Sequence, residues 1–402
     1  MNPTMPPAFN YAGLKIPTPY YIIDRALLRR NMQILEDVQH RSGCKILLAM
    51  KAFSTWGVFQ DMVPFLSGVA TSSFNETMLG KEEFGKQVHM YSPAYSRQEI
   101  RAVLPLVDYL IFNSVNQWKM FKPIVKKYER KIQCGLRINP EYSEVQTELY
   151  NPCTSRSRFG IRQDDLELSD LRGIDGFHFH TMCQQGADVL ERTLELVEDR
   201  FGKYLKRLKW INFGGGHHIT RRGYNVDHLC EIVTRFRRKY GLEIFIEPGE
   251  AHVLNTGFLV TTVLDVIENP NSIDVAIVDS SAAAHMPDVL EMPYTPEILG
   301  ARRVVESGAD TDTPLEEGRY KYIVGSKTCL SGDIIGEYLM QKPLKVGGRI
   351  VFCDMAQYTM CKNTMFNGLN LPAIVSCDSD SPSGNFRVIR KFDYLDFKNR
   401  LS

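Results

Sequence analysis

The chain has 402 residues, which is enough for a large core and favours two domains. Its 48 basic and 47 acidic side chains nearly cancel, which argues against a nucleic-acid surface and against a membrane-attracting face. No apolar run is long enough to span a bilayer, and residues 1–14 lack the apolar segment of a signal peptide. Nine cysteines without a CxxC pair argue against a disulfide framework and a zinc site, and they predict a cytoplasmic location.

The first predicted strand, residues 17–23, opens with two prolines, and prolines favour the edge of a sheet. Asp24 follows this strand and can cap a helix. The apolar positions expected on one face of that helix are Leu27, Leu28, Ile34, Leu35 and Val38.

Eight short apolar runs then alternate with amphipathic helices. The runs lie at residues 45–51, 68–71, 88–91, 109–112, 134–138, 176–180, 210–213 and 243–247. Three helix starts have the capping-box spacing, namely Ser73 with Glu76, Ser96 with Glu99, and Ser114 with Gln117. This alternation predicts a (β/α)8 barrel over residues 25–262, with an open doubly wound sheet as the alternative.

Beyond the barrel the sequence changes character. Strand-like runs at residues 260–267, 275–278, 320–324, 349–353 and 387–392 are separated by Gly, Pro, Asp and Ser. They predict a mainly antiparallel β domain, sandwich-like or barrel-like, built from residues 263–402 and joined by residues 1–24. The polar segment Ser307–Gly318 is expected to be a surface loop within it.

Lys51 ends a strand that is apolar on both faces. Burying an ammonium group is costly unless it is paired or loses its proton. Taken alone, the stretch favours a lysine that extends to the surface. The alternative is an amine made nucleophilic by desolvation, ready to form a Schiff base with a cofactor aldehyde.

Further polar residues lie at the C-terminal ends of the predicted strands, where barrel enzymes have their sites. Gly214–Gly216 follows a strand directly and is either a tight turn or a cradle for a phosphate. Glu247 ends the last strand, where a carboxylate can hold a proton on a pyridine nitrogen. Its alternative role is an ion pair with Arg137.

Two histidines, His178 and His180, share one face of their strand by the two-residue alternation. Cys183 lies nearby, but no second ligand pair exists, so we predict no metal and expect His180 to stack on a cofactor ring. Cys329 is either a buried inert thiol or a proton donor in the loop Cys329–Asp333. Together these patterns indicate pyridoxal 5′-phosphate.

Seven motifs run in order over nearly the whole chain: Met50–Phe53, Phe179–Cys183, Phe213–Gly216, Glu247–Glu250, His285–Asp288, Cys329–Asp333 and Ala356–Tyr358. In these motifs the chain resembles the group-IV decarboxylases, the fold-type III enzymes with an alanine-racemase-type barrel, which include ornithine and diaminopimelate decarboxylases. Within this family it is most similar to the carboxynorspermidine and carboxyspermidine decarboxylases.

The resemblance implies a role for each matching residue. Lys51 would hold pyridoxal 5′-phosphate through a Schiff base, and Cys329 would return a proton to the carbon that loses carbon dioxide. The other cofactor-binding residues would be Arg137 (supporting Glu247), His180 (on the ring), Gly214, Gly215 and Gly216 (at the phosphate), Glu247 (at the ring nitrogen) and Tyr358. The resemblance also implies a homodimer with shared active sites, in which the loop with Cys329 and Asp333 reaches the partner's barrel.

One departure from the family bears on the substrate. Diaminopimelate decarboxylases carry arginines where this chain has Glu250 and Asp288. Acids in place of arginines favour a cation over an anion, so the predicted substrate is a carboxylated polyamine, its nitrogens held by Glu250, Asp288 and Asp333. Carboxynorspermidine and carboxyspermidine differ by one methylene, so the sequence does not rank them. The alternatives are a diaminopimelate decarboxylase-like enzyme and a catalytically silent homologue that binds the cofactor.

Overall fold

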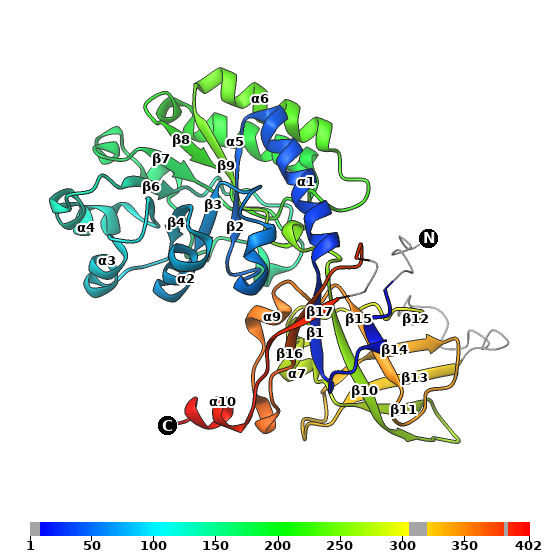
Figure 1. Ribbon diagram of the computed structural model, residues 1–402. Coiled ribbons are helices and arrows are strands. Elements are labelled where there is room, and N and C mark those ends of the chain that lie inside the picture. Colours follow the sequence, from blue (N-terminus) through cyan, green and yellow to red (C-terminus); the bar gives the residue numbers. More distant parts are fainter. Residues whose placement is uncertain (1–8, 305–319, 382–384) are drawn as a thin grey trace. The chain divides into compact units, whose positions relative to one another are not determined.

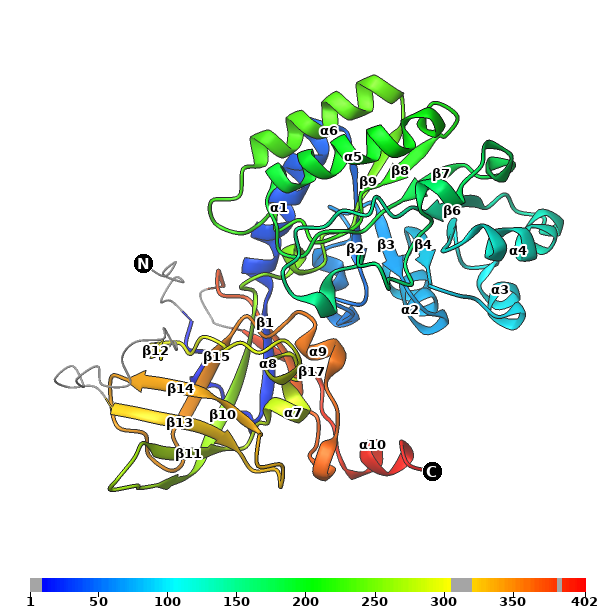
Figure 2. The same ribbon diagram turned by 180° about the vertical axis from the view of Figure 1, so that it is seen from behind.

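The computed structural model describes residues 9–304, 320–381 and 385–402, so the predicted loop Ser307–Gly318 lies outside the described residues. The chain divides into two compact units, which Figures 1 and 2 show from opposite sides. Arg29–His252 forms a barrel unit, and Met1–Leu28 with Val253–Ser402 forms a sheet unit.

The barrel unit contains a closed ring of eight parallel strands, as the alternation of apolar runs predicted. The strands are β2 (Lys45–Ala49), β3 (Gly68–Thr71), β4 (Gln87–Tyr91), β5 (Tyr109–Phe112), β6 (Gln133–Arg137), β7 (Gly176–His178), β8 (Trp210–Asn212) and β9 (Glu243–Ile246). The ring closes where β9 pairs with β2, with Lys45 opposite Phe245. The open-sheet alternative is therefore wrong.

Helices connect most of these strands and cover the outside of the ring (Figure 1). They are α1 (Arg25–Ser42), α2 (Phe74–Leu79), α3 (Arg97–Val103), α4 (Val115–Lys127), α5 (Ala187–Leu205) and α6 (Val226–Tyr240). Between β6 and β7 the described chain has three short 3-10 turns (Glu148–Tyr150, Gln163–Asp165 and Leu168–Leu171) in place of a longer helix. None of the described helices is both long and apolar enough to cross a membrane.

The helix starts occur where the cap residues predicted them. Ser96 and Glu99 form the complete reciprocal capping box of α3. Ser73 and Ser114 also accept the expected backbone N–H, but their boxes are incomplete because Glu76 and Gln117 accept from other backbone groups.

The N-terminal helix α1 is capped by Asp24, whose carboxylate accepts the backbone N–H of Ala26. Its buried face contains Leu28, Leu35 and Val38 as predicted, and also Met32. Ile34 is 37% exposed, so its predicted place on that face is wrong.

A packed aromatic cluster fills the barrel toward the N-terminal ends of its strands. Tyr109, Trp210 and Phe245 pack there with Leu47, Ala70 and Ile111. Gly176 makes room for this packing, since a Cβ at this position would lie 2.0 Å from the Trp210 ring. Side chains fill the barrel interior at this end, so a site is expected at the C-terminal ends of the strands.

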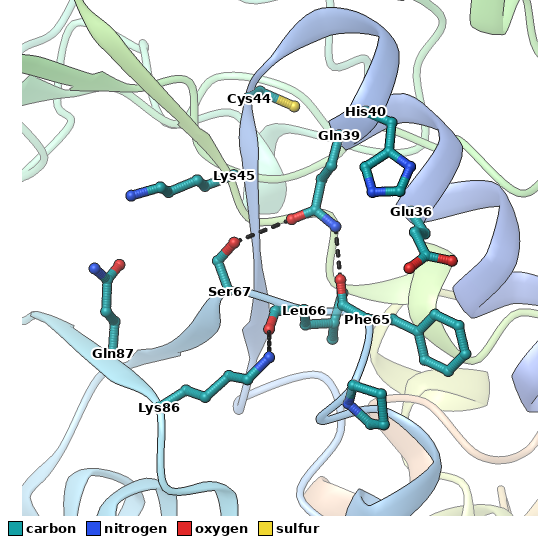
Figure 3. Close-up of a pocket in the computed structure, with 11 residues that line it drawn as sticks. Glu36, Gln39, His40, Cys44, Lys45, Phe65, Leu66, Ser67, Lys86 and Gln87 are labelled. Atoms are coloured by element: carbon teal, nitrogen blue, oxygen red, sulfur yellow. Dashed lines mark hydrogen bonds between the residues drawn. The ribbon is translucent and has the colours of Figure 1, made fainter.

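A pocket of about 560 Å³ lies at the N-terminal ends of β2, β3 and β4 (Figure 3). The side-chain amide of Gln39 crosses it, donating to the carbonyl of Phe65 and accepting from the hydroxyl of Ser67. Lys86 donates to the carbonyl of Leu66. This pocket lies at the opposite end of the strands from the predicted site residues.

The sheet unit holds nine hydrogen-bonded strands in its described part. They are β1 (Tyr20–Asp24), β10 (Gly257–Ile267), β11 (Asp274–Val278), β12 (Ala301–Arg303), β13 (Tyr320–Ser326), β14 (Ile334–Met340), β15 (Arg349–Cys353), β16 (Ala373–Cys377) and β17 (Phe386–Arg390). The order is β12-β14-β13-β11-β10-β1-β16-β17, and β15 also pairs with β10. Every described pairing except β1–β16 and β11–β13 is antiparallel, so the mainly antiparallel prediction is confirmed.

Strand β1 lies inside this sheet, so its predicted edge position is wrong. It pairs with β10 on one side and with β16 on the other, and all five of its residues are buried. Pro17 and Pro19 precede Tyr20, so they remove no N–H group from the hydrogen-bonded ladder. Strand β10 pairs with β1 from its first residue, which is why residues 257–262 belong with the sheet.

Four short helices accompany the sheet: α7 (Ala282–His285), α8 (Asp288–Glu291), α9 (Thr359–Lys362) and α10 (Tyr394–Asn399). The sequence patterns did not predict these helices, nor the strands β12, β14 and β16. The helices and β12 have at most six residues, and periodicity gives little signal over so few. β14 and β16 are as long as strands that were predicted, and they were missed.

Candidate active site

An amine and a carboxylate lie at the C-terminal ends of two neighbouring barrel strands. Lys51 is two residues beyond β2, and Glu247 directly follows β9, which pairs with β2. Desolvation by the surrounding protein lowers the pKa of Lys51, and the negative charge of Glu247 opposes this shift. Burial raises the pKa of Glu247, and the charge of Lys51 opposes that shift in turn.

Solvent still reaches the Lys51 side chain, although its neighbours Met50 and Ala52 are fully buried. Each of the two interpretations of Lys51 therefore describes one of its properties. The amine is accessible to solvent, as in a lysine that extends to the surface, and its surroundings favour the neutral form, as in a nucleophilic amine. A neutral, accessible amine is what nucleophilic attack on an aldehyde requires.

The Glu247 carboxylate is held by a buried amide. Asn212, at the end of β8 and 0% exposed, donates from Nδ2 to Oε1 of Glu247 at 2.6 Å. The other oxygen, Oε2, lies 3.9 Å from Nε2 of His178, which is too far for a hydrogen bond. Oε2 thus makes no hydrogen bond to the part of the chain that the structure describes.

Arg137 makes no ion pair with Glu247 within the described residues, so that alternative for the carboxylate is wrong. Its guanidinium donates to the carbonyl of His180 at 3.2 Å and lies over the rings of Tyr91 and Phe159, 4.7 and 4.4 Å from their centroids. Arg137 acts on Glu247 only through its charge, which lowers the pKa of the carboxyl against the effect of burial.

The glycine run packs so tightly that no residue with a side chain fits. Gly214 and Gly216 have φ of 72° and 85°, and a Cβ there would lie 2.3 Å from the carbonyl oxygen of Phe179 and 2.1 Å from that of Met182. A Cβ on Gly215 would lie 2.6 Å from the carbonyl oxygen of Glu247. The run therefore joins the ends of β7, β8 and β9.

The N–H groups of the run differ in their partners. Gly214 donates to Oδ1 of Asn212 at 2.8 Å, and Gly215 donates to Nδ1 of His180 at 3.2 Å. The N–H of Gly216 has no acceptor among residues 9–304, 320–381 and 385–402. It is the group of the run that can donate to an added phosphate without a rearrangement.

His178 ends β7, and His180 lies two residues beyond it; the surroundings of both histidines favour the neutral imidazole. Burial lowers the pKa of His178 and His180 well below the ordinary value, and the positive charges of Lys51 and Arg137 lower it further. Donor atoms of His178, His180 and Glu247 lie within 4.8 Å of one another. Three such groups could approach one ion, and the prediction that this protein uses no metal stays a prediction.

Pyridoxal 5′-phosphate presents an aldehyde, an aromatic ring, a ring nitrogen and a phosphate. The barrel unit offers a matching group for each: the Lys51 amine, the His180 imidazole, the free oxygen of Glu247 and the glycine run. The side chains present therefore fit this cofactor.

Glu250 is the predicted substrate residue in the barrel unit. Its Oε1 accepts from the amide of Gln184 at 3.0 Å, and its Oε2 lies 3.5 Å from Nε2 of His218. Burial lowers the pKa of this His218 imidazole to about 4.

The remaining predicted residues belong to the sheet unit. Cys329 is exposed, and its N–H donates to Oδ1 of Asn367 at 2.8 Å. Asp288 forms an ion pair with Lys362, which also contacts Glu291. Tyr358 directly precedes α9.

Asp333 is 2% exposed and has partners on both carboxylate oxygens. Oδ1 accepts from the N–H of Ala283 and the hydroxyl of Ser326, and Oδ2 accepts from the hydroxyls of Ser281 and Thr328. These contacts fix the turn that carries Cys329.

Two functional neighbours were not found from the sequence. Asn212 had a usable signal, since it is a polar residue at the end of a buried strand directly before the glycine run. Lys362 had none, because its partner Asp288 is 74 residues away in the chain.

Comparisons with known proteins agree with this geometry. The family model for the pyridoxal-dependent decarboxylases, C-terminal sheet domain, matches residues 20–356. The chain is 42% identical to a carboxynorspermidine/carboxyspermidine decarboxylase of Campylobacter jejuni, covering 96% of this chain and 99% of the relative. It is 41% identical to a carboxyaminopropylagmatine decarboxylase of Synechocystis, covering 96% of each. A crystal structure of carboxynorspermidine decarboxylase with norspermidine, from Campylobacter jejuni, matches with a TM-score of 0.88 at 40% identity, covering 96% of this chain and all of that one.

Proposed function

The chain belongs to the pyridoxal-dependent decarboxylases with a C-terminal sheet domain, and from this we propose that it decarboxylates carboxynorspermidine, carboxyspermidine or both. The products would be norspermidine and spermidine, so the enzyme would serve polyamine biosynthesis. The observation that carries this proposal is the near-full-length likeness to carboxynorspermidine/carboxyspermidine decarboxylases at about 40% identity.

The barrel unit supplies the groups that hold the cofactor, which acts as an electron sink for the carbanion left by the departing carboxylate. Lys51 offers the accessible amine with a lowered pKa. Glu247 presents its free oxygen to the ring nitrogen, and Gly214–Gly216 close on the phosphate. Arg137 keeps the His180 backbone in place, so that the imidazole can lie against the ring.

The sheet unit supplies the remaining roles in this proposal. Cys329 is exposed on a turn and donates a proton to the reacting carbon. Tyr358 lies near the cofactor, and Asp288 and Asp333 hold the nitrogens of the substrate together with Glu250 of the barrel unit. The internal hydrogen bonds of Asp333 favour a further role for it, because they order the turn that presents Cys329.

We further propose a homodimer in which the Cys329 turn of one protomer completes the barrel site of its partner. The exposure of Cys329 supports this arrangement, because an exposed thiol on a turn can enter the site of another chain and donate a proton there. We also assign the protein to the cytoplasm, because none of its nine cysteines is paired in a disulfide.

A second candidate substrate is carboxyaminopropylagmatine, because the Synechocystis relative with that activity is almost as similar to this chain. Diaminopimelate is disfavoured, since Glu250 and Asp288 stand in place of the arginines that would bind its distal carboxylate. A silent homologue is disfavoured because Lys51, Glu247 and Cys329 are all present.

The test is a direct comparison of carbon dioxide release from carboxynorspermidine, carboxyspermidine, carboxyaminopropylagmatine, diaminopimelate and ornithine. We expect the largest kcat/KM with one of the first two compounds. Borohydride should fix the cofactor on the wild-type protein and not on Lys51→Ala. A wild-type protein that binds the cofactor and releases carbon dioxide from none of the five would refute the proposed function.

A further inference from the structure

The side chain of Asn212 belongs to a closed ring of three hydrogen bonds. Its Nδ2 donates to Oε1 of Glu247 at 2.6 Å, and its Oδ1 accepts from the N–H of Gly214 at 2.8 Å. The ring closes through the backbone, where the N–H of Glu247 donates to the carbonyl of Gly214 at 2.8 Å. One buried amide therefore joins the carboxylate to the glycine run.

The orientation of this amide is fixed by its neighbours. Rotation by half a turn would place Oδ1 against the Glu247 carboxylate and Nδ2 against the N–H of Gly214. Both contacts would then be repulsive, so only the observed orientation satisfies the buried groups. Because Asn212 is 0% exposed, no water can replace a lost bond without a rearrangement.

The two ends of the amide serve different parts of the cofactor site. The Nδ2 end occupies one oxygen of Glu247 and leaves Oε2 as the oxygen for a ring nitrogen. The Oδ1 end fixes Gly214 at the start of the run, and the next N–H, that of Gly215, is held by His180. Gly216 is then the glycine whose N–H remains for the phosphate.

We propose that Asn212 is a positioning residue that couples the carboxylate at the ring nitrogen to the loop at the phosphate, so that both ends of the cofactor are held by one side chain. This inference rests on the proposed use of pyridoxal 5′-phosphate at this site. It adds a residue that touches neither the substrate nor the reacting atoms.

Two substitutions at Asn212 distinguish its contact with Glu247 from its contact with Gly214. Asn212→Asp keeps an oxygen for the N–H of Gly214 and replaces the donor to Glu247 by a repelling carboxylate. Asn212→Ala removes both contacts. Gln39→Glu is the matched control, because it makes the same amide-to-acid change in a bridging side chain at the opposite end of the barrel (Figure 3).

The readout is equilibrium binding to the apoenzyme, measured by absorbance, of pyridoxal and of pyridoxal 5′-phosphate. Affinity for pyridoxal reports the ring end, and the ratio of the two affinities reports the phosphate end. We expect Asn212→Asp to weaken pyridoxal binding about tenfold or more and to leave the ratio unchanged. We expect Asn212→Ala to lower both quantities and Gln39→Glu to change neither.

Wild-type affinities in both Asn212 variants would overturn the inference. So would an equal loss of both quantities in Asn212→Asp, because that pattern indicates general loosening of the barrel. Asn212→Asp has nearly the shape of the native side chain, so it keeps the test open even where Asn212→Ala fails to fold. Failure of the proposed function looks different: the wild type then binds both compounds and releases no carbon dioxide from any carboxylated polyamine.

Discussion

Glu247 is a buried carboxyl whose only described hydrogen bond comes from an amide, and whose other neighbour is an uncharged histidine. Nothing else in the barrel competes for its free oxygen, so its charge is available for a ring nitrogen. The position of this residue was predictable because it directly follows a barrel strand, at the end where barrel enzymes have their sites. Its support by Asn212 was not, because the contact joins different strands.

Glu247→Gln tests this role at the residue level. The amide oxygen of glutamine can still accept from Asn212, so the fold should persist while the negative charge is lost. We expect kcat to fall about a hundredfold or more, with cofactor still bound. Glu243→Gln is the control, since Glu243 begins the same strand and pairs with Lys45 at the other end of the barrel. Decarboxylase activity within about twofold of the wild type in Glu247→Gln would contradict the assigned role.

Individual elements were predicted best where their patterns are local. All eight barrel strands were found because each is a short apolar run buried on both faces. The central position of β1 was missed because strand order depends on partners more than 230 residues away, such as Val260 opposite Tyr20. Prolines before a strand do not distinguish an edge strand from a central one.

The packing of β6, β7 and β8 makes a prediction at the element level. Gly176→Ala would place a methyl group against the Trp210 ring, in a core with no free volume at that point. We expect the free energy of unfolding to fall by about 1–3 kcal/mol, measured by urea denaturation.

Gly202→Ala provides the comparison. Gly202 lies within α5, and its added Cβ would meet only the hydroxyl of Tyr240, at an ordinary 3.6 Å. Stability should stay the same or rise by about 0.5–1 kcal/mol, because alanine favours a helix. Equal changes in the free energy of unfolding for Gly176→Ala and Gly202→Ala would show that the close contact with Trp210 does not determine the loss of stability.

At the level of the whole molecule, buried neutral histidines set the response to acid. Burial lowers the pKa of His217, His252 and His285 from 6.5 to about 4. Between pH 4 and pH 6.5 these histidines bind protons in the unfolded chain and not in the folded chain. The stability that these three histidines contribute is therefore fully present above pH 6.5 and declines as the pH falls toward 4, by about 3 kcal/mol for each histidine.

His252→Asn should reduce this acid sensitivity. Asparagine can still donate to the carbonyl of Gly249, as Nδ1 of His252 does, but it does not titrate in this range. Urea unfolding at pH 7 and pH 5 should show a smaller difference in the variant than in the wild type. His40→Asn, on the exposed side of α1, should leave the difference unchanged.

The proposed dimer predicts complementation between two inactive variants. In a mixture of Lys51→Ala and Cys329→Ala chains, each hybrid dimer would contain one site with both native residues. Random assortment should restore about a quarter of the wild-type activity after subunit exchange. Complementation that never exceeds the sum of the separate variants would exclude sites built from two chains.

The ion pair between Asp288 and Lys362 has a consequence for selectivity. If Asp288 receives a substrate nitrogen, the incoming ammonium takes a place that an internal ammonium already fills. Binding is then an exchange of one cation for another, and the carboxylate is never left uncompensated. A compound without a positively charged group at that distance does not displace Lys362 from Asp288, so the protein discriminates against that compound.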